Sequence, residues 1–129
     1  MYVTDSNDFR AMFSDAESFT GDFPNSNIAA WNTGNVTDTS TMFVNAQLFD
    51  ADIGGWITDR VTDMSYMFQN AGNFNHDIST WNVDNVQQCR GFAEASGLAD
   101  MQDLLGRQEL IYRFDLIPFS PRYFWHNCR

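Results

Sequence analysis

The chain has 129 residues, 43% of them hydrophobic and 16% aromatic, which is enough for one compact domain with its own core. Its 17 acidic side chains against 7 basic ones give a formal net charge of −10, which argues against nucleic-acid binding and against polybasic attachment to anionic lipid. No apolar run approaches the roughly 20 residues that cross a bilayer, and the first 25 residues lack the pattern of a secretory signal.

The first element in chain order is an altered copy of a repeat that becomes clear only further along. Met12, Phe13, Ala16 and Phe19 have counterparts 30 residues later, whereas the following copies are 25 residues apart. The five residues 23–27, FPNSN, therefore form an insertion. We expect it to bulge from the first copy as a surface loop.

Residues 31–55 and 56–80 are the two clearest copies, and they agree at 13 positions without a gap. A third copy begins at Trp81 with WNVDNV and then degenerates, so the chain holds about three and a half copies. The shared positions are mostly apolar: Trp31, Trp56 and Trp81; Val36, Val61 and Val86; Phe43 and Phe68; Phe49 and Phe74; Ile53 and Ile78. Units this short bury their apolar face only by stacking on their neighbours, which predicts a solenoid.

Each unit is predicted to contain a short helix and a short strand. In residues 61–71, VTDMSYMFQNA, the apolar side chains recur with spacings of three and four, which predicts two turns of helix. Thr62 or Asp63 can cap the start of this helix, and Asn70 can help to end it. Residues 74–81, FNHDISTW, suit a short extended segment, and stacked copies would pair as a parallel ladder.

The phrases WNTGNVTDTSTMF and FNHDISTWNVDNV, with VTDMSYMF between them, resemble the repeat of BspA-like leucine-rich-repeat surface proteins, which also occurs in mycoplasma-type lipoproteins. The resemblance covers roughly residues 9–92. It implies a leucine-rich-repeat-like solenoid, with short parallel strands alternating with short helices, that serves adhesion or protein contact. It transfers no catalytic residues, and it implies a cell-surface or extracellular location.

The repeat ends near Gly97, so we predict a solenoid over residues 1–97 and a separate tail over 98–129. Residues 98–112 have an amphipathic pattern that suits a helical cap on the open end of the solenoid. The extended segment 115–129 is rich in aromatic residues and arginine, which are enriched at interface hot spots. It is predicted either to dock on a partner protein or to pack on its own solenoid, and its candidate contact residues are Phe119, Arg122, Tyr123, Phe124 and Trp125.

Three aspartates recur at one position of the repeat: Asp22, Asp52 and Asp77. Such a column of carboxylates can hold Ca²⁺ or a cationic patch. Repeated aspartates in solenoids more often accept backbone N–H bonds at a turn, and we favour that interpretation.

The remaining chemistry-bearing residues do not form a catalytic pattern. His76 falls at a position that varies between copies, and Cys89 replaces Met64 as a small apolar residue. These two residues and His126 do not suggest a catalytic nucleophile with a general base beside it, so we predict no enzymatic activity and no cofactor. One disulfide between Cys89 and Cys128 is possible, and the sequence leaves it open.

The sequence therefore predicts a non-catalytic protein-interaction or scaffolding module. Its two versions are an accessory subunit of a larger assembly and a surface adhesion fragment. Membrane association is expected only through a partner. The alternative function is a calcium- or carbohydrate-binding module that uses the aspartate column.

Overall fold

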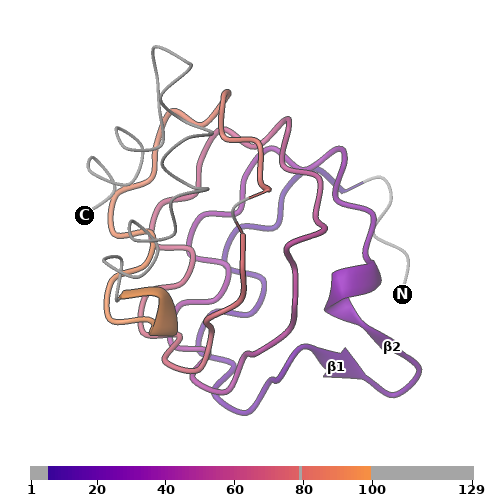
Figure 1. The fold of residues 1–129 in the computed structure, drawn as a ribbon, viewed down its shortest axis with the longest axis vertical. Helices are drawn as coiled ribbons and strands as arrows, with labels where there is room; N and C mark the ends of the chain where they lie inside the picture. The colour runs from indigo at the N-terminus through magenta and orange to yellow at the C-terminus, as the bar shows by residue number, and fades with distance from the viewer. Residues whose placement is uncertain (1–5, 79, 100–129) are drawn as a thin grey trace.

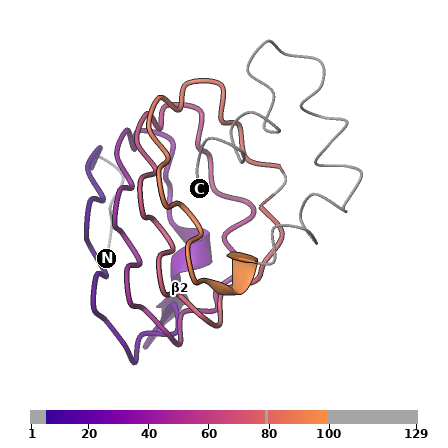
Figure 2. The ribbon, with the colours of Figure 1, turned by 90° about the vertical axis from the view of Figure 1, so that its left-hand side faces the viewer.

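A computed structural model describes residues 6–78 and 80–99. The chain winds through four successive coils that lie side by side (Figures 1 and 2). We name them coil 1 (residues 6–35), coil 2 (36–60), coil 3 (61–85) and coil 4 (86–99). Coil 1 lies at one edge of the stack, and its longer path contains the inserted segment.

Regular secondary structure is sparse in the described residues. Strands β1 (Asp22–Phe23) and β2 (Ser26–Asn27) pair antiparallel as a small hairpin, and the two 3-10 helices are η1 (Ile28–Ala30) and η2 (Gly97–Ala99). The described part of the chain contains no α-helix. The predicted leucine-rich-repeat-like solenoid of alternating short strands and helices is therefore wrong.

The helix predicted over residues 61–71 is absent because the backbone leaves the right-handed region twice in each copy. Tyr66 and Asn70 have φ angles of 55° and 59°, and the matching residues of coil 2, Thr41 and Asn45, have 55° and 60°. The amide of Met67 bonds to the carbonyl of Met64, three residues earlier, at 3.2 Å. This combination describes successive β-turns with positive φ at the third residue, as in type II turns.

Alternate amides of these turns bond to the next coil, and this requirement displaces the helix. The amides of Thr41, Phe43 and Asn45 donate to coil 3 carbonyls at 2.8 to 2.9 Å. Equivalent amides of coil 1 donate to coil 2, and those of coil 3 donate to coil 4. Since the intervening amides close turns within their own coil, this stretch presents N–H groups on one edge and carbonyls on the other. Isolated parallel bridges pair the same positions along the stack: Asp8, Asp38, Asp63 and Gln88.

The insertion in coil 1 forms the β1–β2 hairpin, at the edge of the stack (Figure 1). Asn27 ends the hairpin and caps η1, because its side-chain oxygen accepts the amide of Ala29 at 2.8 Å. The insertion lies at the surface as expected, with residues 24–26 exposed, but it is a hairpin and Phe23 packs on aromatic rings of coil 1. Its ring centroid lies 5.5 Å from that of Phe19 and 5.6 Å from that of Trp31.

Equivalent aromatic side chains form columns through the interior of the stack. The ring of Phe43 stacks on Phe13 at 5.8 Å and on Phe68 at 5.5 Å. Offset aromatic pairs at such distances contribute roughly 0.5 to 1.5 kcal/mol beyond the buried area. Trp56 and Trp81 are buried and donate their indole N–H to the carbonyls of Ile28 and Ile53 in the preceding coil, each at 3.0 Å.

The structure describes residues up to Ala99, so it covers the repeat and almost none of the predicted tail. The proposed division at residue 97 stays a prediction, because nearly all of the predicted cap and the whole aromatic segment lie outside the described residues. Within the part that is described, no helix is both long and apolar enough to span a membrane.

Candidate functional site

An open groove of about 360 Å³ lies beside the hairpin and crosses three coils. We call it the hairpin groove. Its lining residues come from coil 1, coil 2 and coil 3: Thr20, Asp22 and Asn27; Leu48 and Asp50; and Asn73.

Backbone hydrogen bonds hold the walls of the hairpin groove together. The amide of Asp50 donates to the carbonyl of Thr20 at 3.1 Å, and the amide of Asn73 donates to the carbonyl of Gln47 at 3.2 Å. Within the hairpin, the side-chain amide of Asn27 donates to Asp22 Oδ1 at 2.6 Å. The groove is therefore built on paired backbone rather than on free loops.

The chemistry of the hairpin groove is anionic and partly apolar. Asp22 and Asp50 are both exposed, and the side chain of Leu48 lies between polar neighbours with 47% of its surface exposed. None of the described residues that line the groove carries a positive charge. Such a surface offers two carboxylates to a cationic group and one apolar side chain to an alkyl chain.

His76 adjoins the hairpin groove through Asp50. Its Nε2 atom lies 2.8 Å from the carbonyl oxygen of Asp50 and 3.0 Å from Asp50 Oδ1. His76 is partly buried, with 32% of its side chain exposed. The sequence had indicated only that this position varies between copies. Its contact with Asp50 fixes one wall of the groove against coil 3.

The aspartates of the predicted column have separate surroundings. Asp22 lines the hairpin groove, whereas Asp52 Oδ1 accepts the amide of Gly54 at 3.2 Å, as expected for a turn. Asp77 also has an interaction of its own. In the described part of the chain, no three histidine, cysteine, aspartate or glutamate side chains come together in a group that could hold a metal ion.

The other candidate residues lie largely beyond the site. Cys89 is partly buried and disulfide-bonded, and Cys128, the only other cysteine in the sequence, lies outside the described residues. The predicted contact residues of the tail also lie outside them: Phe119, Arg122, Tyr123, Phe124 and Trp125. Their docking role stays a prediction.

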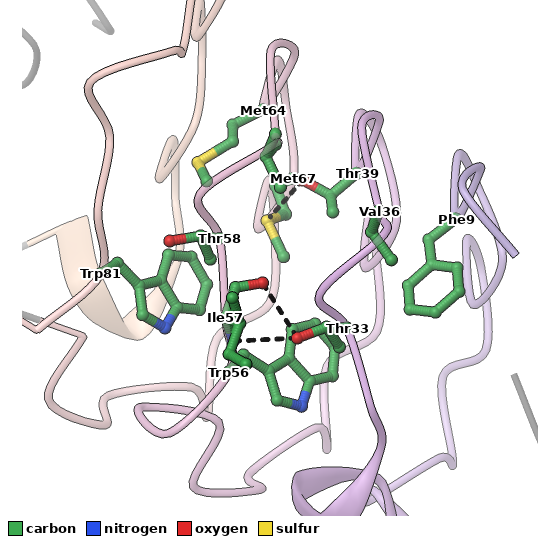
Figure 3. A pocket seen from close by; sticks show the side chains of 11 residues that line it. Phe9, Thr33, Val36, Thr39, Trp56, Ile57, Thr58, Met64, Met67 and Trp81 are labelled. Carbon is green, nitrogen blue, oxygen red and sulfur yellow. Dashed lines mark hydrogen bonds between the residues drawn. The ribbon is translucent and has the colours of Figure 1, made fainter. Parts of the chain in front are cut away.

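A second cavity, of about 10 Å³, lies in the core and is lined by residues of coils 1, 2 and 3 (Figure 3). That is about the space of one water molecule. The threonine hydroxyls around it are already bonded: Thr33 Oγ1 donates to the carbonyl of Ile57 at 3.0 Å, and Thr58 Oγ1 donates to that of Asn82 at 2.8 Å. This cavity is a packing feature, and the hairpin groove remains the candidate site.

Sequence analysis missed most of the hairpin groove, including Leu48, Asp50 and Asn73. Only Asp22 was a candidate. The available signal was the insertion itself, because an interruption of a regular repeat marks the place where the surface departs from that of its neighbours.

Comparison with known proteins places the chain within one family. The model of the family described as "Mycoplasma protein of unknown function, DUF285" matches residues 7–104, well over half of the chain. No curated protein and no solved structure matches this chain.

Proposed function

Because the chain belongs to the DUF285 family of Mycoplasma proteins of unknown function, we propose a role for it from its own surface. It is a non-catalytic protein-interaction module that holds a basic, partly apolar segment of a partner protein in the hairpin groove. The observation that carries this proposal is the pairing of two exposed carboxylates, Asp22 and Asp50, with Leu48 in one open groove.

The charge of the whole chain favours a basic partner. A net charge of −10 attracts cationic segments over several ångströms and speeds their encounter. Within the groove, Asp22 and Asp50 can each accept hydrogen bonds from an arginine or lysine side chain. The resemblance to BspA-like surface repeats supports the proposal, because those proteins are used for adhesion or protein contact.

A labelled peptide of alternating arginine and leucine tests the groove by fluorescence anisotropy at low ionic strength. The double variant D22N/D50N should bind about fivefold more weakly than the unchanged chain, since two exposed ion pairs contribute about 1 kcal/mol together.

The matched control is D59N/D84N, which removes the same charge from two exposed carboxylates outside the groove. Its affinity should fall less than twofold. Equal losses in the two double variants would show that only the overall charge attracts the peptide, and the groove would then have no special role.

A further inference from the structure

The outer edge of coil 1 presents a row of carbonyl groups that are unpaired among the described residues. In coil 2 the carbonyls of Ser40, Met42 and Val44 accept amides of coil 1 at 2.7 to 3.0 Å. The equivalent carbonyls of coil 1 belong to Arg10, Met12 and Ser14, and none of them accepts a hydrogen bond within the described part of the chain. The edge therefore has the same row of hydrogen-bond acceptors as an interior coil, but no neighbouring coil among the described residues donates amides to them.

The side chains at this edge are also those of an interior coil. Met12 is 39% exposed, whereas its counterparts Met42 and Met67 are fully buried. Phe13 and Trp31 are likewise only partly buried. Within the part of the chain that the structure describes, coil 1 thus has a neighbouring coil on one side only.

The hydrogen-bonding pattern restricts which partner can cover this edge. An ordinary extended strand alternates N–H and C=O groups along each edge, so its carbonyls would face the carbonyls of coil 1. A second coil 1 placed head to head would present carbonyls alone. The edge needs a backbone that presents successive N–H groups, which is the property of the opposite edge of these coils.

Among the described residues, the opposite edge belongs to coil 4. The amides of Gly91, Ala93 and Ala95 occupy the positions at which Tyr66, Phe68 and Asn70 donate to the next coil, and among the described residues they find no acceptor. Gly91 and Ala95 also keep the positive φ of their counterparts, at 66° and 56°. The donor edge therefore has the required spacing and conformation.

We propose that two copies of this chain associate head to tail, with coil 4 of one copy stacked on coil 1 of the next. The donor edge of residues 91–95 bonds to the carbonyls of Arg10, Met12 and Ser14. Gln88 supports this arrangement, because it ends the bridged row of Asp8, Asp38 and Asp63 and places a neutral amide beside the next Asp8. This contact and the helical cap predicted over residues 98–112 would occupy the same end of the stack, so the proposal replaces that prediction. The surface is separate from the hairpin groove, so the proposed function and this association do not depend on each other.

Sedimentation equilibrium of the full chain tests the proposal over about 1 µM to 1 mM. We expect the average mass to rise from 14.8 kDa towards dimers and longer chains, because a head-to-tail contact does not close on itself. Met12→Asp should hold the chain at the monomer mass. Ile57→Asp is the matched control, because Ile57 is 52% exposed and belongs to neither edge, and it should leave the association unchanged.

A second variant tests the other end. Ala95→Asp places a carboxylate opposite Asp15 of the next copy, and Asp15 shows that aspartate accepts this backbone conformation, since its φ is 62°. Each variant alone should be monomeric, while an equimolar mixture of M12D and A95D should form a dimer through its one intact pair of edges. A monomeric unchanged chain at every concentration, equal effects of M12D and I57D, or a mixture that stays monomeric would each overturn the proposal.

Discussion

Coil 1 and coil 2 carry nearly the same apolar residues, yet they are buried to different extents. Phe43 and Phe49 are fully buried in coil 2, whereas their counterparts Phe13 and Phe19 are only partly buried in coil 1. The difference arises because, among the described residues, coil 2 has a neighbouring coil on each side and coil 1 has one on a single side. In a stacked repeat the energy of a side chain therefore depends on its place in the array as well as on its identity.

The largest effect of this difference is expected for alanine substitutions in one aromatic column. Phe43→Ala should lower the free energy of unfolding by about 4 kcal/mol, because it leaves a cavity between two stacked rings, and Phe13→Ala should lower it by about 2 kcal/mol. Urea denaturation followed by circular dichroism gives both values. Equal losses would mean that the outer coil is as well covered as the inner one.

The backbone provides the next largest contrast, at the turn that leads into the hairpin. Gly21 has a φ of 110°, and a Cβ atom there would lie 2.5 Å from that of Ala51. Gly21→Ala should therefore lower the free energy of unfolding by about 3 kcal/mol. Gly55→Ala in coil 2 is the control, since no atom lies within 4 Å of the added Cβ, and it should change stability by less than about 0.5 kcal/mol.

The sequence reveals the repeat period, but the local backbone cannot be read from it. The spacing of Val61, Met64, Met67 and Phe68 suits a helix and suits successive turns equally well. The turns prevail because they free alternate amides to bond with the next coil. Positive φ was not foreseen, since Thr41 and Tyr66 are residue types that seldom adopt it.

The hairpin groove escaped prediction for a different reason. Alignment of the copies draws attention to positions that recur, such as Asp22, Asp52 and Asp77. Leu48 corresponds to Asn73, and Asp50 corresponds to Asn75, so these positions look unconstrained. Apart from Asp22, the hairpin groove is built from residues that the copies do not share.

A smaller loss of stability is expected when tryptophan is replaced by phenylalanine at two positions with different surroundings. Trp56 donates its N–H to the carbonyl of Ile28, and Trp56→Phe should cost about 2 kcal/mol because that buried acceptor loses its partner. The indole of Trp31 donates no hydrogen bond within the described residues, so Trp31→Phe should cost less than about 1 kcal/mol. Thermal unfolding of the two variants by calorimetry measures the difference, and a larger loss for Trp31 would contradict it.

The smallest effect concerns the side-chain ladder that joins coils 1, 2 and 3. Asn45 Nδ2 donates to Asp15 Oδ1 at 2.6 Å, and Asn70 Nδ2 donates to Asn45 Oδ1 at 2.8 Å. Asn45→Asp removes a donor and places a second carboxylate beside Asp15, whereas Asn70→Asp faces a neutral amide. Both aspartates tolerate the positive φ, so the first change should cost about 1 kcal/mol and the second about 0.5 kcal/mol. Urea titrations at low and high salt separate the causes, because screening should remove the excess cost of Asn45→Asp and leave the cost of the lost hydrogen bond.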